Sequence, residues 1–174
     1  MSLACENSCS RLIPPEDPAA KTISALELLS TRSDVKIYNE HVTLQSKKRR
    51  EVFNITARVK AAMEKSGFRD GVILVSSLHS NSGVIVNEEE PRFLQVLDDW
   101  LHQLAPSRED FQQQERSESG ADDAAFHLQG LLLHHQVMVS FTETRLDLGL
   151  GQAVLFVELD GLRPRRIVVK VMGE

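Results

Sequence analysis

The stretch that decides the fold is residues 136–173, QVMVSFTETRLDLGLGQAVLFVELDGLRPRRIVVKVMG. It contains four runs rich in Val, Ile, Leu and Phe, separated by charged residues or by turn formers such as Gly161 and Pro164. Such runs are typical of β-strands. Because these strands follow one another without intervening helices, we predict antiparallel pairing and an α+β class of fold.

The residues before this stretch predict further strands. Between residues 35 and 44 apolar and polar residues alternate, which is typical of a strand or a hairpin with one face in water. KKRREVF (47–53) is expected to form a short edge strand, since its charges disfavour unwanted pairing. GVILVSSL (71–78) and GVIVNE (83–88) are so continuously apolar that we expect burial on both faces. The chain thus predicts seven to nine strands and about three helices.

The first predicted helix has Asn54 or Thr56 as its N-terminal cap and Gly67 as its end. The second begins at Pro91, where the missing N–H costs little, and is closed by Pro106. Its expected buried stripe is Phe93, Leu94, Leu97, Leu101 and Leu104, widened by Val96 and Trp100.

The third predicted helix carries AAFHLQGLLLHH (124–135), and Asp122 or Asp123 can cap its start. Residues 107–121 are rich in Gln, Glu, Ser and Arg, which predicts a long mobile loop. Residues 1–33 hold Cys5, Cys9 and three prolines, so we expect a flexible tail followed by a single domain over residues 34–174.

The composition excludes several classes of protein. With 174 residues, 41% hydrophobic and 26% charged, the chain can form a packed core in one domain. A net charge of −5 argues against sequence-independent binding of nucleic acid, which depends on a surplus of Lys and Arg. The chain has no apolar run long enough for a membrane span and no secretory signal pattern, so we expect a cytoplasmic protein that does not enter the membrane.

His79 is the first candidate functional residue, because it stands between two apolar runs beside Ser77, Ser80, Asn81 and Ser82. An imidazole there can bind a metal or transfer a proton near neutral pH, and the polar neighbours can fix its tautomer. The alternative is a loop histidine that only meets solvent.

His127 is the second candidate, because it lies one helical turn after Asp123. Side chains at i and i+4 share a helix face, so the carboxylate can orient the imidazole. An ordinary surface pair has the same spacing. Asp122 and Asp123 could also bind Mg²⁺, but the sequence favours helix capping as the use of at least one of them. His134 and His135 are interpreted as solvated or strand-edge residues.

Basic residues around Pro164 form a further candidate site. Arg165 and Arg166, with Arg163 before the proline, could bind a phosphate or a partner's carboxylate through their forked donors. A charged edge turn explains the same residues. We find no phosphate-binding loop and no serine or cysteine nucleophile motif.

Several motifs, in the same order along residues 42–174, resemble the YjbQ family, often described as secondary thiamine-phosphate synthases. FNITARVKAAMEKSGFRDGVILV (53–75) is similar to the family's Ile-Thr helix and apolar strand, and LHSNSGVIVNEEEP (78–91) to its histidine turn and Asn-Glu. GADDAAFHLQ (120–129) resembles its acidic pair and second histidine. TRLDLGLGQAVLFVELDG (144–161) and RPRRIVVKVMGE (163–174) are similar to its last two strands.

This resemblance implies a mostly antiparallel β-sheet or sandwich, a homotrimer, and coupling of a pyrimidine pyrophosphate to a thiazole phosphate. A zinc or magnesium ion is the implied cofactor, and a small phosphorylated molecule the implied ligand. The expected catalytic residues are His79, Asp123, His127 and Gln152, with His79 and His127 as metal ligands. The expected substrate-binding residues are Asn81, Asn87, Arg165 and Arg166.

The chain also departs from the family pattern. Phe111-Gln112-Gln113 stands where the family has Tyr-x-His, and Leu150-Gly151 where it has Thr-Trp. Losing a histidine weakens a zinc site, and losing an indole removes a pocket wall. Two hypotheses therefore follow: a transferase of the family type, or a non-catalytic trimeric binding or scaffold protein.

Overall fold

The computed structural model describes residues 35–106 and 121–174, with the side chains of the second segment described from residue 124. The predicted tail, the predicted loop and the proposed caps Asp122 and Asp123 fall outside this description, so those expectations stay predictions. Within the described residues, no helix combines the length and the apolar character that a membrane crossing requires.

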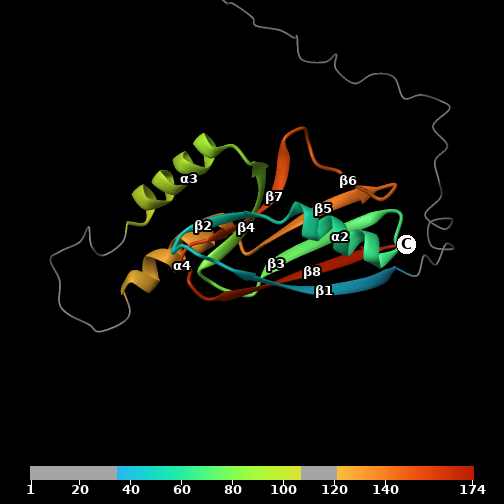
Figure 1. Ribbon diagram of the computed structural model, residues 1–174, viewed down its shortest axis with the longest axis horizontal. Helices are drawn as coiled ribbons and strands as arrows, with labels where there is room; N and C mark the ends of the chain where they lie inside the picture. The colour runs from blue at the N-terminus through green and yellow to red at the C-terminus, as the bar shows by residue number, and fades with distance from the viewer. Residues whose placement is uncertain (1–34, 107–120) are drawn as a thin grey trace, which may run out of the picture. The chain divides into compact units, whose positions relative to one another are not determined.

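The described strands form two antiparallel sheets (Figure 1). The larger sheet has the order β1-β8-β3-β5-β6, and the smaller sheet the order β2-β7-β4. The strands are β1 (Lys36–Gln45), β2 (Glu51–Asn54), β3 (Gly71–Ser77), β4 (Ser82–Glu88), β5 (Gln136–Thr142), β6 (Arg145–Leu146), β7 (Gln152–Glu158) and β8 (Pro164–Gly173). With three helices among the described residues, this arrangement confirms the predicted α+β class.

The pairing of the strands differs from the expectation that neighbours in sequence pair. Among the described strands, only β5 and β6 are both consecutive and paired, whereas β7 and β8 belong to different sheets. β8 instead lies between β1 and β3, where Lys36 faces Gly173 and Val75 faces Val169. Short connections favour local pairing, but here burial of the apolar faces against each other decides which strands meet.

The main core is built from one face of each sheet and from α2 (Thr56–Ser66). Along β8, Arg165, Ile167, Val169 and Val171 are buried, and the residues between them are more exposed. β3 alternates in the same way, so the prediction that it is buried on both faces was wrong. Each fully buried Val, Leu or Ile stabilises the fold by roughly 1.5–3 kcal/mol.

Helix α2 ends at Gly67 as the sequence predicts, whereas its N-cap position is Ile55, which makes no side-chain capping hydrogen bond. Asn54 Oδ1 accepts a hydrogen bond of 3.0 Å from the Thr56 N–H, which satisfies an otherwise free donor of the first turn. Gly67 ends the helix in the left-handed conformation, with φ of 72°, and its N–H bonds to the Glu64 carbonyl.

Helices α3 (Pro91–Leu104) and α4 (Ala121–Leu133) flank the smaller sheet's own apolar cluster. That cluster contains Leu101, Phe126, Leu133, Val157 and Leu159. Pro91 opens α3 as expected, but Leu101 is the only fully buried residue of its predicted stripe. Trp100 is 46% exposed and Val96 64% exposed, so the expected width of the buried stripe was wrong for the single chain.

Candidate functional site

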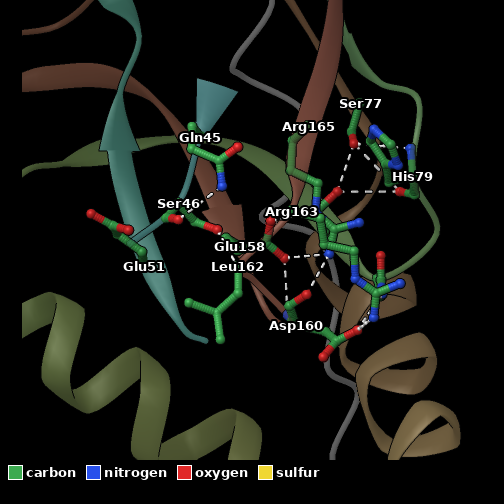
Figure 2. Close-up of polar contacts among 12 residues, drawn as sticks. Gln45, Ser46, Glu51, Ser77, His79, Glu158, Asp160, Leu162, Arg163 and Arg165 are labelled. Atoms are coloured by element: carbon green, nitrogen blue, oxygen red, sulfur yellow. Dashed lines mark hydrogen bonds and ion pairs between the residues drawn. The ribbon is translucent and has the colours of Figure 1, made fainter. Parts of the chain in front are cut away.

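The turn that carries His79 joins the end of β3 to the start of β4. Its shape is fixed by two serine hydroxyls, Ser77 Oγ and Ser82 Oγ, which lie 2.6 Å apart and are both buried. The His79 N–H donates to Ser77 Oγ at 3.2 Å (Figure 2). The His79 carbonyl accepts from Ser82 Oγ at 3.3 Å. The polar residues noted in the sequence therefore hold the turn in place.

The His79 imidazole is itself held by the backbone of β8. Its Nε2 accepts a hydrogen bond of 2.9 Å from the Arg166 N–H, and the neighbouring Leu78 N–H donates to the Arg166 carbonyl at 3.1 Å. An imidazole nitrogen that accepts a hydrogen bond carries no proton, so the proton of neutral His79 resides on Nδ1. His79 can therefore donate a hydrogen bond through Nδ1–H, whereas its Nε2 already accepts one from the Arg166 N–H.

The electrostatic surroundings keep His79 neutral. Partial burial lowers the pKa of the His79 imidazole below its ordinary value, and the positive charge of Arg165 lowers it further. Arg166 and Arg163 act in the same direction, whereas Glu158 opposes them. Three arginines and one carboxylate thus act on the charge of this imidazole.

A pocket of about 510 Å³ opens beside His79. Its lining comes from the His79 turn, including the exposed Ser80, and from the end of α4 and the residues that follow it: Gly130, Leu131, His134 and His135. His134 and His135, which the sequence led us to interpret as solvated or strand-edge residues, are indeed exposed, and they also share one pocket with His79. The sequence did not reveal that they lie beside His79, because their position depends on how α4 packs and not on the residues next to them in the chain.

Close backbone contacts hold His134 and His135 in this position. The His134 carbonyl accepts from the Val84 N–H at 3.1 Å, and the His135 carbonyl from the Ser77 N–H at 2.7 Å. His134 has φ of 60°, a left-handed conformation that is rare for residues other than Gly, Asn and Asp. Gly130 lets α4 approach the His79 turn, since a Cβ there would lie 2.5 Å from the Ser80 carbonyl oxygen.

A buried ion pair lies near this pocket (Figure 2). The Arg165 guanidinium pairs with both carboxylate oxygens of Glu158, with Nη2 2.7 Å from Oε1, and also donates to the Asp160 carbonyl at 2.7 Å. Both side chains are almost completely buried. A substrate-binding role for Arg165 stays a prediction that this burial does not favour, whereas Arg166 is exposed.

The Asp160 carboxylate accepts hydrogen bonds from other polar side chains of this region. Its Oδ2 accepts from Arg163 Nη2 at 2.5 Å (Figure 2) and from Asn81 Nδ2 at 3.1 Å. One donor of the Asn81 amide is therefore engaged inside the protein, which ties the His79 turn to the segment after β7.

Asn87 and Gln152 lie at the other end of the smaller sheet. Ser82 pairs with Glu158 near the His79 turn, whereas Asn87 pairs with Ala153 and Glu88 with Gln152. Six residues of extended strand span about 20 Å. Gln152 Oε1 accepts from the Gly149 N–H at 2.8 Å, and Asn87 Oδ1 from the Glu88 N–H at 2.8 Å. Within one chain, these two residues do not join the His79 pocket.

His127 is exposed on α4 and is not among the residues that line the His79 pocket. Among the residues that the structure describes, no group of three or more His, Cys, Asp or Glu side chains is arranged to hold a metal ion. His79 Nε2 accepts a hydrogen bond from the Arg166 N–H, and a zinc ion held by His79 and His127 stays a prediction. The Asp123 side chain lies outside the description, so its predicted role stays a prediction.

Comparison with known proteins finds one family throughout. Residues 40–174 match the family described as UPF0047 protein YjbQ-like. A UPF0047 protein of Methanothermobacter thermautotrophicus is 34% identical over 140 residues, which cover 80% of this chain and 95% of that protein. Another, from Archaeoglobus fulgidus, is 34% identical over 131 residues, which cover 75% of this chain and 98% of that protein.

Solved structures agree with the sequence comparison. A YbjQ-like protein of unknown function from Sulfolobus solfataricus superposes with a TM-score of 0.72 at 26% identity, covering 80% of this chain and 99% of that one. A hypothetical protein from Aeropyrum pernix gives a TM-score of 0.67 at 25% identity, with coverage of 78% and 98%. Sequence and fold lead to the same conclusion: the chain belongs to the YjbQ-like UPF0047 family.

Proposed function

We propose that the His79 pocket binds a small phosphorylated molecule. The observation that carries this proposal is the neutral imidazole of His79, which has Nε2 fixed on β8, Nδ1–H free to donate, and three arginines acting on it. A phosphate accepts hydrogen bonds from such donors and is attracted by the positive field. The cavity volume of about 510 Å³ lies within the range of small-molecule sites.

The groups available to the phosphate come from both sides of the pocket. The turn supplies His79 and the Ser80 hydroxyl, and the end of α4 supplies the imidazoles of His134 and His135. Exposed Arg166 adds a positive charge near His79. In this arrangement the buried pair of Arg165 with Glu158 positions the His79 turn and contributes to the electrostatic potential at His79. The pair does not itself contact the ligand.

Calorimetric titration with inorganic phosphate and pyrophosphate tests this proposal. We expect saturable binding that His79→Ala weakens roughly ten- to hundredfold, the range expected for losing one hydrogen bond to a charged group. His102→Ala is the matched control, because His102 is an exposed histidine on α3 outside the pocket. Equal affinities of the His79 and His102 variants would contradict the proposal.

A second candidate is the reaction that the family resemblance implies. In this proposal a pyrimidine pyrophosphate is coupled to a thiazole phosphate: the thiazole nitrogen forms a C–N bond, and the C–O bond to pyrophosphate breaks. The arginine-rich surroundings of His79 favour it, because positive charge stabilises a pyrophosphate leaving group. His127, Asp123, Asn87 and Gln152 would then act from a neighbouring subunit of a trimer.

Incubation with both precursors and Mg²⁺ separates the two candidates. Formation of thiamine phosphate and pyrophosphate, reduced by both His79→Ala and His127→Ala, would support the transferase. Ligand binding without product, unaffected by His127→Ala, would support a binding protein. Product formation that neither variant reduces would exclude the proposed roles of both histidines.

A further inference from the structure

Two exposed leucines line the His79 pocket, one from the turn and one from α4. Leu78 comes directly before His79, and Leu131 lies near the end of α4. Leu78 is 46% exposed and Leu131 73% exposed, and neither belongs to one of the two apolar clusters of the core. A single exposed leucine is ordinary, but two that line the same pocket give a ligand apolar contact from both walls.

Backbone contacts hold both leucines at the pocket. The Leu78 N–H donates to the Arg166 carbonyl at 3.1 Å, which ties this residue to β8. Leu131 follows Gly130, where α4 lies so close to the turn that a Cβ would be 2.5 Å from the Ser80 carbonyl oxygen. Because both walls are in place before a ligand arrives, binding does not have to order their backbone.

The lining offers few hydrogen-bonding groups beyond those that a phosphate would use. Ser77 and Ser82 are buried, and their hydroxyl oxygens lie 2.6 Å apart in a hydrogen bond to each other. The other polar side chains of the described lining are Ser80 and three histidines, and this lining contains no Asp, Glu, Asn or Gln. A sugar or a nucleobase needs several such partners, because each polar group left unpaired in a site costs affinity. The lining therefore disfavours a sugar phosphate or a nucleotide.

An aliphatic group suits the two leucines better. Each methylene that moves from water into full apolar contact raises the affinity roughly fourfold, and about twofold where half of its surface stays in water. An aromatic group gains additional affinity when it stacks on another ring, but the described lining contains no Phe, Tyr or Trp.

We propose that the ligand of the His79 pocket is a phosphate monoester of an aliphatic alcohol, and that Leu78 and Leu131 determine this specificity. The inference rests on the proposed function, since it takes the phosphate to be bound by His79. The phosphate oxygens accept from His79 Nδ1–H and from the Ser80 hydroxyl, and the alkyl group lies between the two leucines. This class of ligand differs from the heteroaromatic phosphates that the second candidate requires.

Calorimetric titration of the full protein with ethyl, butyl and hexyl phosphate tests the inference. We expect the affinity to rise about twofold per methylene, so hexyl phosphate should bind at least tenfold more tightly than ethyl phosphate. Glucose 6-phosphate and benzyl phosphate should bind less tightly than hexyl phosphate, and 1-hexanol, which lacks the phosphate, at least tenfold more weakly. Equal affinities along the alkyl series would overturn the inference, as would tighter binding of glucose 6-phosphate or benzyl phosphate.

Substitution of the leucines locates the alkyl group. Leu131→Ala and Leu78→Ala should each lower the ratio of hexyl to ethyl phosphate affinity at least threefold and leave the affinity for ethyl phosphate unchanged. Leu132→Ala is the matched control, because Leu132 is an exposed leucine next to Leu131 that does not line the pocket. A ratio that neither Leu131→Ala nor Leu78→Ala lowers below that of the control would refute the location.

His79→Ala separates this inference from the proposed function. This substitution should weaken ethyl and hexyl phosphate by the same factor and leave their ratio unchanged, because it removes a contact to the phosphate only. If the esters bind through His79 but longer alkyl groups add no affinity, the phosphate site stands and the inference fails. Esters that His79→Ala does not weaken would contradict the proposed function itself, and the inference with it.

Discussion

At the scale of single residues, the buried pair of Arg165 and Glu158 is costly to break. Arg165→Met leaves the Glu158 carboxylate buried without its partner, which we expect to lower the free energy of unfolding by about 3–5 kcal/mol. Urea denaturation measures this loss. Lys60→Ala is the control, because Lys60 and Glu64 form an exposed pair whose loss should change little. Equal effects of both substitutions would contradict the structural role.

His79 gives a pH dependence whose sign follows from its surroundings. Its pKa is lower in the folded protein than in the unfolded chain, so the unfolded chain binds the proton more tightly. The stability contribution of His79 is therefore complete above about pH 6.5 and is lost as the pH falls through the folded pKa. NMR titration of the imidazole should give a midpoint below the ordinary value of a histidine, about 6.5, and a phosphorylated ligand should raise it. A midpoint above that ordinary value would contradict this account.

At the scale of elements, the contact of α4 with the His79 turn depends on Gly130. Gly130→Ala gains helix propensity of about 1 kcal/mol, but its Cβ would lie 2.5 Å from the Ser80 carbonyl, which costs about 1–3 kcal/mol to relieve. The carbonyl is backbone and cannot rotate away, so we expect a net loss of about 1 kcal/mol. Urea denaturation of Gly130→Ala and of Leu128→Ala, an exposed control on the same helix, checks this. A more stable Gly130→Ala variant would refute it.

The helices and strands themselves were largely predictable from the sequence. Which strands pair with one another was not. The end of α2 at Gly67 and Pro91 of α3 are local signals, and the alternation of apolar residues along β1 is equally local. The pairing of β8 with β1 and β3, by contrast, joins residues far apart in the chain, and no local pattern encodes it. His79 could be found as a polar residue between apolar runs. His134 and His135 could not, because only the packing of α4 brings them beside it.

At the scale of the whole molecule, one face of the larger sheet is left without a cover by the described residues. Val72 and Leu74 alternate with the buried residues of β3, and the register places Val72 and Ile37 beside Met172, and Leu74 beside Met138. Ile37 is 58% exposed and Met138 61% exposed. Exposed apolar strips of this kind are typical of surfaces that bind other proteins.

We therefore expect this sheet face to contribute to the homotrimer implied by the family resemblance. Light scattering coupled to gel filtration should give three times the mass of one chain. Met138→Lys should shift the mass toward the monomer, because a charge buried between subunits is costly. Leu150→Lys is the control, since Leu150 is fully exposed in the loop before β7. A monomeric parent protein, or a trimer that Met138→Lys leaves intact, would exclude this surface.

The place of β8 in the larger sheet also governs how the chain can fold. It follows every other described strand in sequence, yet it joins β1 to β3, so the sheet cannot close until residues 164–173 are available. Contacts between such distant residues raise the entropic barrier of the transition state, and domains of this kind refold in milliseconds to seconds. Until β8 has paired, the edges of β1 and β3 that it covers remain unpaired. Aggregation through these edges during synthesis then competes with folding.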